Sequence, residues 1–175
     1  MSVDCELPTL RGERVMLRPL AEGDVDFLAD AICEPEVARW WSPDSREQHR
    51  SGLLEDVRER GAFAIEVGGA LAGWIGVHEE TEPHYRHGSL DIFLAPAHHG
   101  AGLGPEALRL AARWLIEERG HHRLTIDPAA ANERAIGVYA SIGFRPVGVM
   151  RGYERGADGE WHDGLLMDLL APELR

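Results

Sequence analysis

The sequence contains no lysine, so all 18 of its basic residues are arginines, and 30 acidic residues outnumber them. The formal net charge of -12 at pH 7 is opposite to what a nucleic-acid groove requires, and it favours a cationic partner. An acidic surface also keeps a protein soluble without binding anything in particular. The charge therefore gains functional meaning only beside a defined site.

Cysteines and long apolar runs are also scarce. Cys5 and Cys33 are the only cysteines, and their separation fits neither a metal pair nor a redox pair. No stretch approaches the roughly 18 to 20 continuous apolar residues of a membrane span, and the amino terminus has no signal-peptide pattern. We therefore expect a soluble, cytoplasmic protein in which residues 1–175 form one domain with a single core.

Strand and helix signals follow one another along the chain. Asp24 is placed to cap a first helix, Ser45 and Gln48 form a capping box for a second, and Gly68-Gly69 makes a tight hairpin turn. Strands are predicted over residues 13–20, 62–67, 70–79, 89–95, 122–126, 144–155 and 160–170, and helices over 24–33, 45–60, 103–120 and 132–141. The order β-α-α-β-β-β-α-β-α-β-β predicts an α/β (α+β) fold, with a mixed, mostly antiparallel central sheet flanked by helices.

The most informative segment is FLAPAHHGAGLGPEALRLAARWLIEERG, residues 93–120. Gly100, Gly102 and Gly104 separate a strand from an amphipathic helix, which leaves bare backbone N–H groups at a helix start and predicts an anion site. A Walker loop would need a lysine, and the spacing differs from the dinucleotide fingerprint. A turn eased by glycine, with no ligand, is the alternative.

This loop, the later segment NERAIGVYASIGF and the element order together resemble the GNAT superfamily of acetyl-CoA-dependent N-acetyltransferases. The family signature, Gln/Arg-x-x-Gly-x-Gly/Ala, falls on residues 99–104, where histidine replaces the usual first residue. The resemblance implies that backbone amides bind the diphosphate of acetyl-CoA. It implies cofactor contacts from Phe93, Leu94, His99, Gly100, Ala101, Gly102, Leu103, Gly104, Asn132 and Tyr139.

The proposed chemistry needs a proton donor for the leaving thiolate and an acceptor for the attacking ammonium. Tyr139 lies two helical turns after Asn132 on the same face, and the resemblance places its hydroxyl near the sulfur, as general acid. Asp91 lies in the strand before the loop, opposite in parity to Leu90 and Ile92, and is our general base. Each residue also has a non-catalytic alternative. Tyr139 is alternatively a buried aromatic that anchors a helix, and Asp91 is alternatively a solvated residue on the polar face of the sheet.

A closer resemblance is to the aminoglycoside 6'-N-acetyltransferases. It rests on EVARWW, LDIFLAPA, LTIDPAAANERAIGVYASIGF and the acidic turn GADGE. It implies an antibiotic pocket lined by Trp40, Trp41, Asp91, Asp127 and Asp158. Carboxylates and flat aromatic walls suit a polyammonium sugar. The tryptophans are alternatively packing residues, and Asp127 alternatively ends a strand in a turn.

The sequence thus predicts transfer of acetyl from acetyl-CoA to a cationic small-molecule amine, most specifically the 6'-amine of an aminoglycoside, an antibiotic-resistance activity. Protein amino-terminal acetylation of the ribosomal-protein type, which shares the LRPL opening, is the runner-up, and a non-catalytic acyl-CoA sensor is a third hypothesis. The histidines lack metal-ligand spacing, so we expect no metal. We expect no nucleic-acid or membrane partner, and either a monomer or a homodimer.

Overall fold

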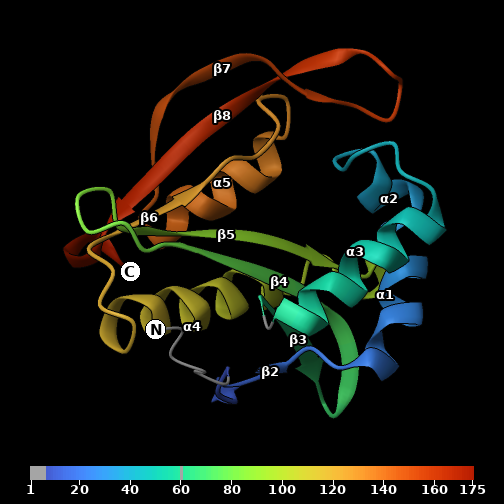
Figure 1. Ribbon diagram of the computed structural model, residues 1–175, viewed down its shortest axis with the longest axis horizontal. Helices are drawn as coiled ribbons and strands as arrows, with labels where there is room; N and C mark the ends of the chain where they lie inside the picture. The colour runs from blue at the N-terminus through green and yellow to red at the C-terminus, as the bar shows by residue number, and fades with distance from the viewer. Residues whose placement is uncertain (1–6, 60) are drawn as a thin grey trace.

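The computed structural model describes residues 7–59 and 61–175. Cys5 and Arg60, the predicted end of the second helix, lie outside the described residues. In the described part, eight strands form one sheet in the order β1-β2-β3-β4-β5-β6-β8-β7 (Figure 1). The strands are β1 (Leu10–Arg11), β2 (Val15–Pro19), β3 (Ala62–Val67), β4 (Ala70–Glu80), β5 (His87–Leu94), β6 (Arg123–Ile126), β7 (Arg145–Arg155) and β8 (Trp161–Leu170).

Helices cover both faces of the sheet. They are α1 (Val25–Ile32), α2 (Pro35–Ala38), α3 (Arg46–Glu59), α4 (Leu103–Glu117) and α5 (Glu133–Ile142). Buried side chains of α4 and α5 share one core cluster with Leu90 and Leu94 of β5, whereas those of α1, α2 and α3 share a second cluster with Phe93. The predicted alternation of β5 is therefore confirmed. In the described residues, no helix is long and apolar enough to cross a membrane.

The pairing of β5 with β6 creates the opening that matters for function. Every other neighbouring pair is antiparallel, but β5 and β6 are parallel and pair only at Gly88 with Leu124 and at Ser89 with Thr125. Beyond these positions the two strands separate. In the described residues, the second half of β5, which contains Asp91, is thus paired with β4 alone.

Two short elements are additions to the predicted order. The predicted strand over 13–20 is shorter than expected and is preceded by β1, and a one-turn helix, α2, follows α1. Elements of two and four residues are too short to display a period, so pattern analysis cannot detect them.

The predicted turn and cap signals have different outcomes. The Ser45–Gln48 capping box is confirmed, because Ser45 N–H donates to Gln48 Oε1 at 2.8 Å. The Gly68-Gly69 turn is also confirmed, with φ of 59° and 82°. Asp24 occupies the predicted N-cap position of α1, but its carboxylate makes no cap hydrogen bond to that helix. The carboxylate accepts hydrogen bonds from Arg18, at 2.7 and 2.8 Å, and from the Ala21 N–H, at 2.9 Å.

Candidate active site

Residues 99–104 form a loop with its backbone donors exposed. Gly100 and Gly102 have φ of 79° and 75°, in the left-handed region that favours glycine. Among the described residues, no hydrogen bond uses the N–H groups of Gly100, Ala101 or Gly102. The next N–H groups, of Leu103 and Gly104, open α4 and have no acceptor within the helix. Such a row of donors at a helix start fits a diphosphate.

A cavity of about 710 Å³ lies against this loop. All but one of the predicted cofactor residues line this cavity; the exception is Ala101. Those that line it are Phe93, Leu94, His99, Gly100, Gly102, Leu103, Gly104, Asn132 and Tyr139. The His99 ring does not extend like the arginine or glutamine of the family pattern, since its Nε2 lies 2.8 Å from the Leu94 carbonyl oxygen. His99 therefore ties the loop to the end of β5.

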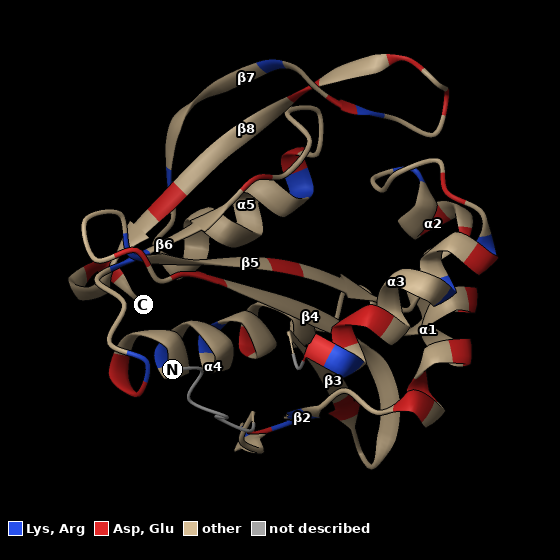
Figure 2. Ribbon diagram, viewed as in Figure 1, with Lys and Arg blue, Asp and Glu red and all other residues tan. Residues whose placement is uncertain are grey.

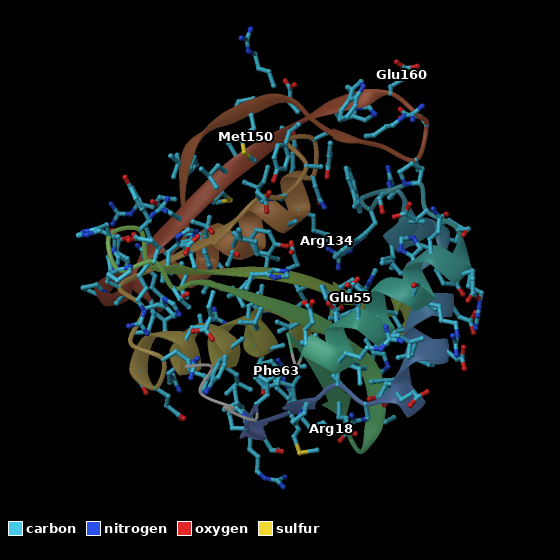
Figure 3. The ribbon with its side chains drawn as sticks, viewed as in Figure 1. Arg18, Glu55, Phe63, Arg134, Met150 and Glu160 are labelled. Carbon is cyan, nitrogen blue, oxygen red and sulfur yellow. The ribbon has the colours of Figure 1, made fainter. Side chains whose placement is uncertain are left out.

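Asn132 begins α5 at the same cavity. Its Oδ1 accepts a hydrogen bond from the Ala135 N–H at 3.1 Å, which is an N-cap interaction. The cap uses the side-chain oxygen, and it does not use the two amide hydrogens of Asn132. Arg134 lines the cavity as well, and Figure 3 shows it between α5 and the layer formed by α2 and α3. In a chain without lysine, it brings a positive charge to this cavity.

Tyr139 combines packing with access to the cavity. Its side chain is buried, and its ring lies edge-on to Phe144 with 6.4 Å between centroids. Tyr139 therefore helps to anchor its helix, as the alternative interpretation of the sequence predicted. Burial raises the pKa of its hydroxyl well above the ordinary value, and the charges of Asp91 and Asp127 raise it further. The hydroxyl therefore stays protonated and can act as a hydrogen-bond donor.

Asp91 is not a solvated surface residue. It lies opposite Gly76 of β4, where the Trp74 ring occupies the space that a side chain would need. Burial raises the pKa of Asp91 to about 6, with a further increase from the charge of Asp127. The carboxylate is consequently poised to bind and release a proton near neutral pH.

Four carboxylates from different elements surround this point, and we call them the acidic cluster. Its members are Asp56 of α3, Asp91 of β5, Asp127 after β6 and Glu154 of β7, and all three others raise the pKa of Asp91. Burial raises the pKa of Asp56 and of Glu154, and in Glu154 the charge of Asp127 adds to it. Figure 2 shows red segments on β5, on α3 and on β7, three of the elements that carry members of the cluster.

Three residues of the site are not among those predicted from the sequence: Asp56, Glu154 and Tyr153. The Tyr153 hydroxyl donates a hydrogen bond to Asp127. That hydrogen bond, together with burial, raises the pKa of Tyr153 to about 12. One signal was present for Asp56: it lies between Leu53 and Val57, on the apolar side of its helix, where an acidic residue is unusual. Glu154 and Tyr153 carry no comparable signal in the sequence.

A second cavity, of about 690 Å³, adjoins the first and shares Arg39, Trp40, Trp41 and Ala131 with it. Trp41 packs edge-on against Trp74 and Phe93, with centroid distances of 5.8 and 5.5 Å. Trp41 therefore has the packing role that the sequence predicted as the alternative to substrate binding. The Trp40 ring lies 4.9 Å from the Arg39 guanidinium. Both tryptophans therefore form a wall between the two cavities.

Asp158 lines the second cavity from the tip of the β7–β8 hairpin. Its carboxylate oxygens both lie 2.8 Å from Nε2 of His162, and this pairing lowers the pKa of Asp158 and raises that of His162. Asp91 and Asp127 line neither cavity directly. They are coupled to Tyr139, which lines the first cavity, and to Glu154, which lines the second. In the described residues, no group of three or more histidine, cysteine or acidic side chains is placed to hold a metal ion.

A donor-rich loop at a helix start, two parallel strands that pair at only two positions, and an acid electrostatically coupled to a tyrosine are the features of an acyltransferase that uses a coenzyme A thioester. The family model described as "Acetyltransferase (GNAT) domain" matches residues 14–145. The chain belongs to the GNAT family. It is an acetyl-CoA-dependent N-acetyltransferase.

Relatives of the chain act on different amines. It is 27% identical over 159 residues to spermidine N(1)-acetyltransferase of Escherichia coli (strain K12), covering 87% of this chain and 84% of the relative. It is 26% identical over 163 residues to aminoglycoside N(6')-acetyltransferase type 1 of Klebsiella pneumoniae, covering 81% and 79%. Mycobacterium smegmatis RimJ in complex with CoA-disulfide has the same fold, with a TM-score of 0.81 at 24% identity over 95% of this chain and 88% of that chain.

Proposed function

We propose that the chain transfers acetyl from acetyl-CoA to a primary amine of a polycationic small molecule, and that the 6'-amine of an aminoglycoside is the best-fitting acceptor. The observation that carries this proposal is the acidic cluster beside a cavity with tryptophan walls. Several carboxylates held close together repel one another, and several ammonium groups on one ligand relieve that repulsion. An acceptor with a single ammonium group would leave most of the repulsion between the carboxylates in place.

The proposed reaction uses Asp91 and Tyr139. Acetyl-CoA supplies the acetyl group as a thioester. Asp91 removes a proton from the acceptor ammonium, and the freed nitrogen lone pair forms a bond to the acetyl carbon. The attack gives a tetrahedral intermediate whose nitrogen is positively charged. Tyr139 gives its hydroxyl proton to the sulfur as the carbon–sulfur bond breaks and the carbonyl re-forms, and it is reprotonated through solvent by the second proton that the nitrogen loses. Asp91 returns the first proton to solvent. Their electrostatic coupling supports this pairing, because the charge of Asp91 raises the pKa of the Tyr139 hydroxyl.

The lining of the second cavity favours an amino sugar over the other acceptors. Trp40, Trp41 and Trp161 line a space of about 690 Å³, and flat rings pack well against sugar faces. The acidic lining from Glu154, Asp158 and Asp163 matches ammonium groups spread around a ring system rather than along a thin chain.

The test is a thiol-release assay with purified protein, acetyl-CoA and three acceptors at equal concentration. The acceptors are a kanamycin-type aminoglycoside, spermidine, and a peptide with a free amino-terminal alanine. We expect the aminoglycoside to give a kcat/KM at least about tenfold above the others, and mass analysis to place the acetyl group on its 6'-amine. A higher kcat/KM for the peptide would refute the polycationic acceptor. A higher value for spermidine would keep the polycation and refute the aminoglycoside.

Variants on one helix provide a matched comparison for the same assay. Asp56→Asn removes a charge from the acidic cluster, whereas Glu55→Gln removes a neighbouring, exposed charge on α3. The label of Glu55 in Figure 3 marks its place. We expect Asp56→Asn to raise KM for the preferred acceptor several-fold and Glu55→Gln to leave it unchanged. Equal effects of the two substitutions would show only a general charge effect.

A further inference from the structure

Arg14, which lies just before β2, is bonded to the outside of the glycine loop. Its Nη1 donates to the Ala101 carbonyl oxygen at 2.6 Å, and its Nη2 donates to the Gly102 carbonyl oxygen at 3.2 Å. Its Nε donates to Oε2 of Glu106, in the first turns of α4, at 3.0 Å. All three nitrogens of one guanidinium group therefore connect the start of the sheet to the loop and its helix.

These contacts fix where the loop's donors point. In a trans peptide unit, the C=O bond and the N–H bond of the next residue point in opposite directions. The carbonyl groups of Ala101 and Gly102 point toward Arg14, so the N–H groups of Gly102 and Leu103 point away from it. Gly102 and Leu103 line the first cavity, and neither Arg14 nor Ala101 does. Arg14 thus holds the two peptide units with their donors toward the cavity.

The attachment is itself fixed by backbone groups. Oε1 of Glu106 accepts hydrogen bonds from the N–H groups of Arg14, at 2.7 Å, and Val15, at 3.2 Å. A Cβ atom on Gly12 would lie 2.7 Å from that oxygen, so only glycine leaves the carboxylate in place. Gly12, Arg14 and Glu106 together form a rigid frame behind a loop whose two left-handed glycines would otherwise be conformationally free.

Polarisation of the loop's peptide units supports the same role. Hydrogen bonds from a guanidinium to a carbonyl oxygen polarise the peptide unit, which makes its N–H a stronger donor. The charge of Arg14 itself is balanced by its ion pair with Glu106, at 3.0 Å. The contribution to diphosphate binding therefore comes from the orientation and polarisation of the N–H groups.

We propose that Arg14 is a positioning residue for acetyl-CoA: it touches no reacting atom, but it aims the N–H groups of Gly102 and Leu103 at the diphosphate. The inference rests on the binding of acetyl-CoA at this loop. The role predicts a selective loss: affinity for coenzyme A falls, while binding of the amine acceptor and the chemical step are preserved.

The experiment compares Arg14→Ala, Arg14→Lys and a matched control, Arg11→Ala, in the full-length protein. Arg11 is also an arginine near this edge of the sheet, but its guanidinium contacts Sδ of Met16 instead of the loop. Calorimetry measures Kd for coenzyme A, steady-state kinetics separate kcat from KM for acetyl-CoA, and thermal unfolding checks the fold. We expect Arg14→Ala to raise both Kd and KM about tenfold, with kcat changed less than about threefold.

Arg14→Lys should recover part of the affinity, because one ammonium can bond one carbonyl but cannot reproduce the three-way contact. Arg11→Ala should bind coenzyme A as the wild type does. A folded Arg14→Ala protein with unchanged Kd and KM would overturn the proposal. If Arg14→Ala does not fold, the Arg14→Lys protein decides, and an unchanged Kd there also overturns it. Failure of the wild type to bind coenzyme A would instead refute the binding of acetyl-CoA at the loop.

Discussion

Tyr139 and Asp91 are electrostatically coupled: after burial, the carboxylate of Asp91 is the largest cause of the raised pKa of the Tyr139 hydroxyl. Burial raises the pKa of Asp91 itself to about 6. One group therefore stays protonated while the other changes charge near neutral pH. This difference is what a donor and an acceptor of protons in one site require.

Replacing Asp91 by asparagine should abolish the proton acceptor without changing the side-chain size. We expect kcat/KM for the amine to fall roughly 10²-fold or more. In the wild type, kcat/KM should decrease as pH falls through about 6, because Asp91 becomes protonated. The residual activity of the variant should lack that decrease. A variant with the wild-type pH profile would show that another group is the base.

The same substitution should stabilise the fold. The pKa of Asp91 is raised above its ordinary value of 3.8, so its ionised form is disfavoured in the folded state and costs stability above about pH 6. The cost is absent below about pH 4, where the group is protonated in both states. Urea unfolding should therefore show Asp91→Asn to be more stable than wild type at pH 7.5, by up to about 3 kcal/mol, and nearly equal to it at pH 4. A less stable variant at pH 7.5 would contradict the destabilising burial of this charge.

Tyr139→Phe keeps the ring that packs on Phe144 and removes only the hydroxyl. We expect kcat to fall roughly 10²-fold, with KM for acetyl-CoA changed less than threefold, because the hydroxyl acts when the carbon–sulfur bond breaks. Thermal unfolding should show an intact fold. An unchanged kcat would leave Tyr139 with the packing role alone.

Gly102→Ala should strain the loop. Its φ of 75° is unfavourable for any residue with a Cβ, and that atom would lie 3.3 Å from Nη2 of Arg14. We expect a loss of stability of about 1–2 kcal/mol and an increase of about tenfold in Kd for coenzyme A. Gly52→Ala is the matched control, since its Cβ meets nothing within 4 Å and helix α3 continues through it. It should leave Kd unchanged and increase stability slightly.

Local patterns predicted most elements of the fold, because they depend on neighbouring residues. The apolar stripe of α4 and the alternation of β5 were both correct for this reason. The separation of β5 from β6 was not predictable, since it depends on residues far apart in the chain. Arg14 contacts Ala101 across 87 positions, and no sequence period records such a contact.

The candidate site was predictable to the extent that it rests on a contiguous motif. Residues 99–104 and Asn132 could be identified, because a glycine spacing and a helix start are visible in the sequence. The acidic cluster was only half identified. Asp91 and Asp127 belong to recognisable segments, whereas Asp56 and Glu154 join them only through folding.

The most direct test of the acidic cluster measures kcat/KM at low and high salt for amines that carry one, two or more ammonium groups. Wild type and Glu154→Gln are compared, with the exposed Glu160→Gln as control. The account predicts that wild-type kcat/KM increases with the number of ammonium groups, and that salt or Glu154→Gln weakens this increase while Glu160→Gln does not. Equal kcat/KM for acceptors with one and with several ammonium groups would contradict it.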